Sequence, residues 1–233
     1  MAISLVLQRR MLLGGALLVP AAPLLAAPRQ ASPKAKAAAE ITVTATERLM
    51  RNDGILMRVL QIYDAGIRRL GQDEDLEPLV FIQTAEVMRD FVHGYLEKAK
   101  EEHVYPPFKK AGRMVELVDV LQVQHEGGRR LTERVAKSAE PARNNKAERT
   151  ALIDAMKATC TLYRPHMARE TTDLLPTLRS LVTPKEFEEI SAALEKREAE
   201  LFGADGFEKV AKKVEALEKK IGIHDLSQFT PKS

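Results

Sequence analysis

Residues 166–176 constrain the fold more than any other stretch, because they place polar side chains inside a long helical pattern. His166 and Glu170 are four residues apart, so on a helix their side chains project from the same face. Apolar residues recur at helical spacing on both sides and indicate that this face is buried: Leu152, Ile153, Met156, Leu162, Leu174 and Leu178. A buried imidazole beside a buried carboxylate needs a partner, and a metal ion satisfies both. The alternative is that the two groups satisfy each other together with a few water molecules.

A second segment of similar layout precedes this one, so the chain reads as two helical hairpins of one design. The second helix of each hairpin carries a proline, Pro106 or Pro176, and the positions to be compared lie at similar distances before it. The matching positions are Asp53, Leu96 and Lys100 in the first hairpin, and His125, His166 and Glu170 in the second. Two such hairpins would pair into a bundle.

These positions resemble the ligand pattern of the haemerythrin-like (HHE cation-binding) domain, from about residue 46 to the C-terminal Gln-Phe-Thr-Pro. The resemblance implies an antiparallel four-helix bundle that holds two irons. In that pattern each hairpin supplies a His from its first helix and a His-x-x-x-Glu from its second. By this resemblance His125, His166 and Glu170 are metal ligands, and Glu97 matches an accessory carboxylate of the first hairpin.

The first hairpin departs from this resemblance at its ligand positions. Asp53 and Leu96 stand where the pattern expects histidines, and Lys100 stands where it expects a bridging glutamate. Thr171 also fills a place that often carries aspartate. The resemblance therefore predicts the fold in full but only half of the metal site.

Lys100 argues against a second ion. In an effective dielectric of about 20, two unit charges about 4 Å apart interact by roughly 4 kcal/mol, and a divalent ion would meet about twice that repulsion. Leu96 offers an ion no lone pair. We expect the Lys100 ammonium to replace one cation and to bridge Asp53 and Glu170. Asp53 could instead complete a four-ligand site with the second hairpin.

The composition supports one soluble helical domain with appendages. The chain has 233 residues, of which 45% are hydrophobic and 30% are charged, and its formal net charge is only +3. No basic run is interleaved with aromatic residues, so we do not expect nucleic-acid binding. The single cysteine, Cys160, cannot form an internal disulfide, and its apolar neighbours predict a place in the core.

Residues 1–27 have the layout of an export signal. Arg9 and Arg10 precede an apolar run that reaches Leu18, and the segment ends in an Ala-Ala pair. The twin arginines favour the export route for folded proteins, and hence the bacterial periplasm. An uncleaved membrane anchor is the alternative, but the run is short for a spanning helix, so no stable membrane span is expected after removal of the signal. Residues 28–45, rich in Ala, Lys and Pro, read as a linker.

Apolar periodicity predicts an all-α chain, because no long stretch alternates at period two. The four-helix bundle spans residues 46–182, with helices at about 46–70, 77–109, 113–139 and 147–181. We expect Pro106 and Pro107 to bend or loosen the end of the second helix. A C-terminal helical hairpin follows at 183–222, where Thr183 and Asp205 would cap helices at 184–202 and 206–221. Residues 223–233 form a tail.

Several other polar residues are weaker candidates for the site. Those expected at the periphery or in solvent are His93, His224, Glu101 and Glu102. His103 would be an exposed histidine at a helix end, or alternatively a group beside the site. The tyrosines expected to make structural hydrogen bonds inside the bundle are Tyr63, Tyr95 and Tyr163.

We therefore expect an exported helical bundle that binds a single metal ion through His125, His166 and Glu170, with Asp53 and Glu97 beside them. The expected role is binding or sensing rather than oxygen transport. The resemblance favours iron, and zinc or manganese suit the same donors. The main alternative is a scaffold or interaction protein that holds no metal at all. An enzyme is not expected, with a mononuclear oxidase or peroxidase as a third hypothesis, and the sequence indicates no particular protein partner.

Overall fold

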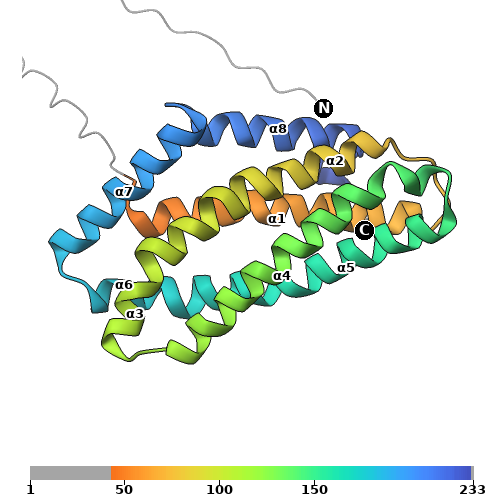
Figure 1. Ribbon diagram of the computed structural model, residues 1–233. Helices are drawn as coiled ribbons and strands as arrows, with labels where there is room; N and C mark the ends of the chain where they lie inside the picture. The colour runs from red at the N-terminus through yellow and green to blue at the C-terminus, as the bar shows by residue number, and fades with distance from the viewer. Residues whose placement is uncertain (1–42, 232–233) are drawn as a thin grey trace, which may run out of the picture. The chain divides into compact units, whose positions relative to one another are not determined.

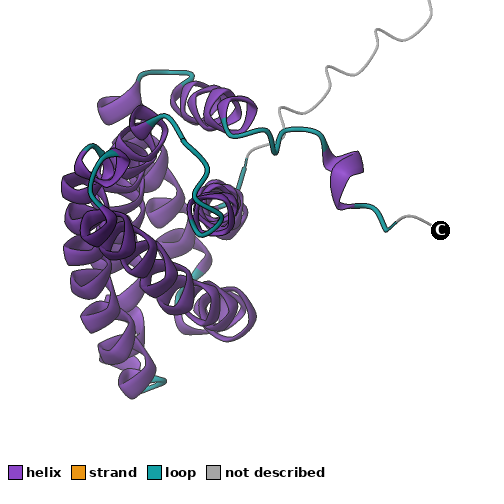
Figure 2. Ribbon diagram, turned by 90° about the vertical axis from the view of Figure 1, so that its right-hand side faces the viewer, coloured by secondary structure: helices purple, strands orange, loops and turns teal. Residues whose placement is uncertain are grey.

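Four long helical segments, each antiparallel to the next, lie side by side in residues 43–231, the part that the computed structural model describes (Figure 1). The first is α1 (Ala45–Leu70). The second runs through α2 (Pro78–Val87) and two π-helical segments, η1 (Met88–Glu97) and η2 (Lys100–Val104), into α3 (Tyr105–Ala111). The third is α4 (Val115–Ala139), and the fourth is α5 (Lys146–Arg169), the π-helical η4 (Glu170–Leu174) and α6 (Leu175–Leu181). Helices and loops alone make up this region (Figure 2), which confirms the predicted all-α four-helix bundle.

Two further helices, α7 (Pro184–Phe202) and α8 (Gly206–Lys220), pack along α1 and α2 as the predicted C-terminal extension (Figure 1). Charged pairs join them to the bundle. Arg58 of α1 donates two hydrogen bonds to Glu218 of α8, at 2.8 and 2.6 Å. Arg48 of α1 donates to Glu198 of α7 at 3.2 Å, and both side chains are buried. A short 3-10 turn, Leu226–Phe229, follows α8.

Local sequence sets the starts of two of these helices. Thr44 and Glu47 form a reciprocal capping box at the start of α1, and Thr183 and Glu186 form another at the start of α7, as predicted for Thr183. Asp205 stands at the N-cap position of α8, as predicted, but its side chain makes no capping hydrogen bond. That helix is held instead by its apolar face against the bundle, where its buried residues include Val210, Val214 and Leu217.

Two π-helical segments directly precede prolines, at matching places in the two hairpins. The η2 segment ends just before Tyr105-Pro106-Pro107, and η4 ends just before Leu175-Pro176. Proline lacks an N–H and its ring crowds the preceding turn, so the chain widens there to keep its other backbone groups paired. These wider turns agree with the prediction that Pro106 and Pro107 loosen their helix. Lys100 and Glu170, the first residues of the two π-helical segments, are both buried in the bundle.

The bundle core is apolar along most of its length, and Cys160 lies in it as predicted, at 3% exposure. Two of the three expected tyrosine hydrogen bonds are present: Tyr95 donates to Glu198 at 3.0 Å, and Tyr163 donates to Glu97 at 2.6 Å. The hydroxyl of Tyr63 is buried without a hydrogen-bond partner in the described residues, so that prediction was wrong. Tyr63 therefore acts as an apolar ring in the core.

The predicted export signal at residues 1–27, and all but the end of the predicted linker at 28–45, lie outside the described residues. Among the helices of residues 43–231, none combines the length and the apolar character needed to cross a membrane.

Candidate metal centre

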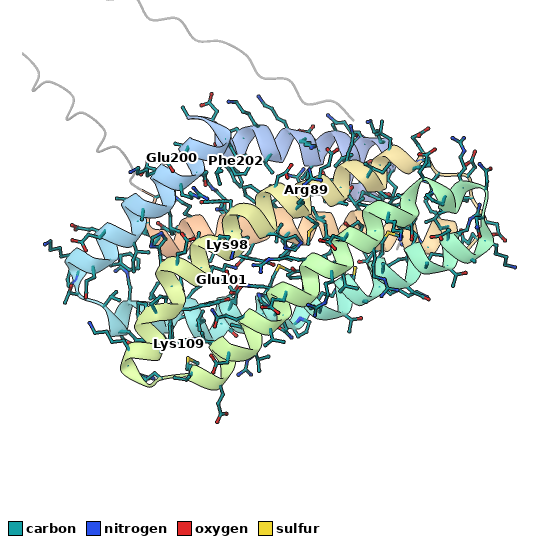
Figure 3. The ribbon with its side chains drawn as sticks, viewed as in Figure 1. Arg89, Lys98, Glu101, Lys109, Glu200 and Phe202 are labelled. Carbon is teal, nitrogen blue, oxygen red and sulfur yellow. The ribbon has the colours of Figure 1, made fainter. Side chains whose placement is uncertain are left out.

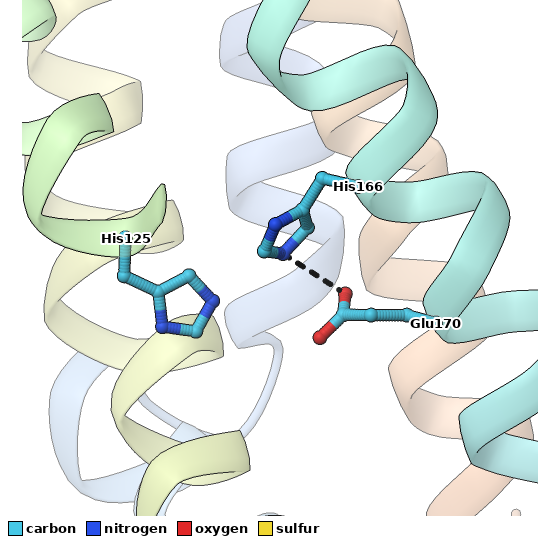
Figure 4. A group of neighbouring side chains, drawn as sticks. All are labelled: His125, His166 and Glu170. Carbon is cyan, nitrogen blue, oxygen red and sulfur yellow. Dashed lines mark ion pairs between the residues drawn. The ribbon is translucent and has the colours of Figure 1, made fainter. Parts of the chain in front are cut away.

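Three buried donors from the second hairpin converge between α4 and the fourth helical segment (Figure 4). His125 comes from α4, His166 from α5 and Glu170 from η4, and one ligand atom of each lies within 4.8 Å of the others. The imidazole centroids are 5.0 Å apart, and His166 Nε2 lies 3.4 Å from Glu170 Oε2. All three side chains are at most 3% exposed, so water does not reach them freely.

Hydrogen bonds orient both imidazoles. His125 Nδ1 lies 2.8 Å from Glu101 Oε1, and His166 Nδ1 lies 2.9 Å from Gln124 Oε1. Carboxylate and amide oxygens only accept, so each Nδ1 donates to its partner and each Nε2 is the ring nitrogen that faces the centre. Metal-ligating histidines are held in this way by partners on their far nitrogen.

Glu101, labelled in Figure 3, was expected in solvent, and that prediction was wrong because its carboxylate bonds the buried His125. Besides His125 it accepts hydrogen bonds from Arg129 at 2.7 Å and Lys98 at 2.8 Å. Burial opposes ionisation, but these hydrogen bonds outweigh it and hold the pKa of Glu101 well below its ordinary value. A stripe of polar residues four apart, His93, Glu97 and Glu101, is the signal that could have found it.

Lys100 occupies the place between the two hairpins, as predicted. Its ammonium donates to Asp53 Oδ1 at 2.8 Å and to Glu170 Oε2 at 2.5 Å, and the residue is only 2% exposed. Burial works against this charge, yet the two carboxylates together raise the pKa of Lys100 above its ordinary value. Asp53 thus pairs with Lys100, which was one of the two predictions for it, and it lies outside the three-donor cluster.

The two carboxylates share this ammonium unequally. Burial disfavours the charge of Glu170, but Lys100 and His166 outweigh it and lower the pKa of Glu170. Burial raises the pKa of Asp53 to about 6, because Lys100 offsets it only in part and Glu170 adds repulsion. Asp53 Oδ2 is also buried without a hydrogen-bond partner in the described residues.

Tyr105 completes the surroundings of the cluster, and sequence reasoning did not single it out. Its hydroxyl donates to Glu170 Oε1 at 2.8 Å and lies 3.3 Å from His125 Nε2. Its ring lies nearly parallel to the His125 imidazole, at 19° and a centroid distance of 5.8 Å. Burial, followed by the charge of Glu170, raises the pKa of Tyr105 above its ordinary value, so the phenol is protonated when no ion is bound.

Glu97, the expected accessory carboxylate, lies outside the three-donor cluster, in a buried network that Arg129 joins to Glu101. It accepts from Tyr163 at 2.6 Å, lies 3.0 Å from His93 Nδ1 and pairs with Arg129 at 3.4 Å. Burial disfavours its charge, but the hydrogen bond from His93 leads the effects that lower the pKa of Glu97. The expectation that His93 is peripheral was wrong, because Glu97 and Thr132 satisfy both of its nitrogens inside the bundle.

The remaining histidines lie away from the cluster. His103 is half-buried and has only Glu102, at 4.0 Å, as a charged neighbour, and His224 is exposed. The exposed position of His224 agrees with its expected peripheral site. The expectation that His103 is exposed at a helix end was wrong, because it is half-buried within η2 and the helical segment continues through α3.

The donor set fits one metal ion. Two imidazole nitrogens and a carboxylate suit Fe(II), Zn and Mn. Donors that share a tetrahedral ion with bonds of about 2.0–2.1 Å lie about 3.3–3.4 Å apart. The 3.4 Å between His166 Nε2 and Glu170 Oε2 matches that separation. A second ion would find the buried aliphatic side chain of Leu96 and the ammonium of Lys100 instead of donors.

Comparisons with known proteins identify the family of the chain. The family model described as "Hemerythrin HHE cation binding domain" matches residues 44–178. Relatives from Mycobacterium tuberculosis, strains H37Rv and CDC 1551, and from Mycobacterium bovis are each 39% identical over 193 residues. That match covers 82% of this chain and 76% of each relative, and each is described as an uncharacterized protein. No solved structure matches the chain significantly. By its sequence match and its helical bundle, this chain belongs to the haemerythrin HHE cation-binding family.

Proposed function

We propose that this protein binds a single metal ion, iron first, through His125, His166 and Glu170, and that it serves in metal binding or sensing. The observation that carries the proposal is the position of Lys100, whose ammonium lies 2.5 Å from Glu170 and 2.8 Å from Asp53. A positive group already stands where a second ion would share the glutamate. Reversible oxygen carriage by an iron pair is therefore not part of the proposal.

Each residue around the proposed ion has a definite task. His125 and His166 would hold it through Nε2, while Glu101 and Gln124 fix their rings. Glu170 would give it a carboxylate oxygen and keep its bond to Lys100. When bound, the ion supplies a Lewis-acid or one-electron redox centre in a site from which bulk water is largely excluded.

A metal-free scaffold is the second candidate, and one observation favours it. Both oxygens of Glu170 already have protein partners, Tyr105 on one and Lys100 on the other. A cluster that satisfies itself does not require an ion.

Metal content per chain separates the two functions. The protein is loaded with ferrous iron, zinc or manganese under anaerobic conditions, desalted and measured by elemental analysis. We expect about one ion per chain, and a loss of at least about tenfold in affinity for His166→Ala. His103→Ala, which removes a histidine outside the cluster, is the matched control and should leave the content unchanged. A wild-type protein that retains no ion after loading would support the scaffold instead.

We also propose that the protein is exported, on the strength of Arg9, Arg10 and the apolar run that follows. Replacing both arginines by lysine in the full chain should leave the protein in the cytoplasm of a bacterial host. Wild-type protein found only in the cytoplasm of a host with an intact twin-arginine route would contradict the proposal.

A further inference from the structure

We infer that Tyr105 is a fourth ligand of the proposed ion and that it binds as a phenolate. This inference rests on the single-ion site proposed above. It adds a donor of a different chemical class to two imidazoles and a carboxylate, and it predicts a coloured ferric form.

The position of the hydroxyl carries the inference. Tyr105 Oη lies 3.3 Å from His125 Nε2, which is the separation expected for two donors of one ion, about 3.3–3.4 Å. That nitrogen faces the centre, because Nδ1 on the other side of the ring is hydrogen-bonded to Glu101. On its other side the hydroxyl donates its proton in a hydrogen bond to Glu170 Oε1, at 2.8 Å.

The phenol is held in this position by its surroundings. Tyr105 begins α3, directly after the π-helical η2 and directly before Pro106, so its backbone is constrained on both sides. Its ring is 1% exposed and lies nearly parallel to the His125 imidazole. The hydroxyl therefore stays at the edge of the cluster, with no solvent-facing alternative.

Charge balance favours a phenolate once a ferric ion is bound. Lys100 and Arg129 offset two of the four carboxylates around the site, and the imidazoles bring no charge when they ligate. The four carboxylates are Asp53, Glu97, Glu101 and Glu170. A divalent ion would then balance the buried site, whereas a ferric ion would leave one excess positive charge, which is costly. Tyr105 would hold the ion through its phenolate oxygen, with its hydroxyl proton released to solvent, and this release would remove one positive charge from the site. A phenolate thus stabilises the ferric state in particular.

Tyr163 provides a matched control. It is also a fully buried tyrosine beside the site, with its ring 5.6 Å from the His166 ring. Its hydroxyl, however, donates to Glu97 at 2.6 Å and so points to a carboxylate outside the three-donor cluster. Phenylalanine at either position keeps the ring and removes only the hydroxyl.

The test uses the full chain loaded with ferrous iron and then oxidised. Iron content is measured by elemental analysis and the ferric form by visible absorption and resonance Raman spectroscopy. We expect a phenolate-to-iron charge-transfer band and tyrosinate ring modes in the wild type. Per bound iron, the band should be lost in Tyr105→Phe and kept in Tyr163→Phe.

The outcomes separate the two proposals. Wild-type protein that binds no iron would overturn the single-ion site itself. Iron bound without a phenolate band, or a band that persists in Tyr105→Phe, would overturn the tyrosine ligand alone. Tyr105→Phe could remain helical but take up no iron. In that case, tyrosinate ring modes that are present in the wild type and kept in Tyr163→Phe support Tyr105 as the ligand. Ring modes that are absent from the wild type or lost in Tyr163→Phe contradict it.

Discussion

The ammonium of Lys100 lies between two carboxylates at a depth where few lysines are found, at 2% exposure. A buried charge is tolerated there only because both partners are charged and close. If a metal ion stood in place of the Lys100 ammonium, the same two carboxylates would lie beside it. At the residue scale, we propose that this ammonium takes the place of a second ion and so limits the site to one metal.

Lys100→Met keeps most of the side-chain volume and removes the charge. Asp53 and Glu170 would then lie buried without their shared cation, so the free energy of unfolding of the metal-free protein should fall by about 3 kcal/mol or more. Urea denaturation followed by circular dichroism measures this. Lys109→Met, on an exposed side chain in α3, is the control and should change the value by less than about 1 kcal/mol. Equal effects of the two variants would mean that Lys100 does not hold the carboxylates.

Asp53 gives the metal-free protein a pH dependence of a definite sign. Its pKa rises from the ordinary 3.8 in the unfolded chain to about 6 in the folded one, so the folded state binds more protons between these values. The contribution of Asp53 to stability is therefore largest below pH 3.8 and is lost as the pH rises to about 6. Asp53→Asn should remove a slope of roughly 1 kcal/mol per pH unit in this window. Parallel stability curves for wild type and variant would contradict the shift.

At the scale of the elements, the sequence predicts where the helices begin and end better than it predicts which side chains point into the bundle. Caps and apolar periodicity are local, so the helix expected at 46–70 is found at Ala45–Leu70. Placing side chains by an α-helical period failed within the second helical segment, because η1 and η2 are wider turns. His93 and Glu101 consequently face α4 instead of solvent, and Tyr105 reaches the donors of the second hairpin. The Lys100 bridge was predictable, because the family resemblance placed Lys100 at a buried position between the hairpins, where its charge would need partners.

Helix α4 approaches α5 closely at Gly128. A Cβ on this residue would collide with the hydroxyl of Tyr163, which Glu97 holds in place. Gly128→Ala should therefore destabilise the protein by about 1–3 kcal/mol in thermal or urea denaturation. Gly54→Ala in α1 meets no neighbour and should instead stabilise by about 0.5–1 kcal/mol, because glycine disfavours a helix interior. Stabilisation by both substitutions would contradict the close approach.

Across the folded region of residues 43–231, α7 and α8 hold the first hairpin through charged groups that are largely buried. The side chain of Glu198 is central, because it accepts hydrogen bonds from Arg48, Arg51 and the hydroxyl of Tyr95. The C-terminal helices therefore support the helices that carry Asp53 and Lys100, although they contribute no donor to the cluster.

Glu198→Ala would leave these donors without their acceptor. We expect a loss of about 3 kcal/mol in the free energy of unfolding, since removing one member of a buried pair leaves the other uncompensated. Glu200→Ala, on the exposed side of the same helix, should change it by less than about 1 kcal/mol. Denaturation of both variants side by side provides the comparison, and a loss below about 1 kcal/mol for Glu198→Ala would contradict the anchoring role.

The central claim is that the bundle holds one ion because the first hairpin has lost its donors. Restoring them with the triple variant Asp53→His, Leu96→His and Lys100→Glu tests this most directly, by the iron content per chain after anaerobic loading. The claim predicts about one iron per chain in the wild type and about two in the triple variant. Two irons in the wild type, or no increase in a folded triple variant, would contradict it.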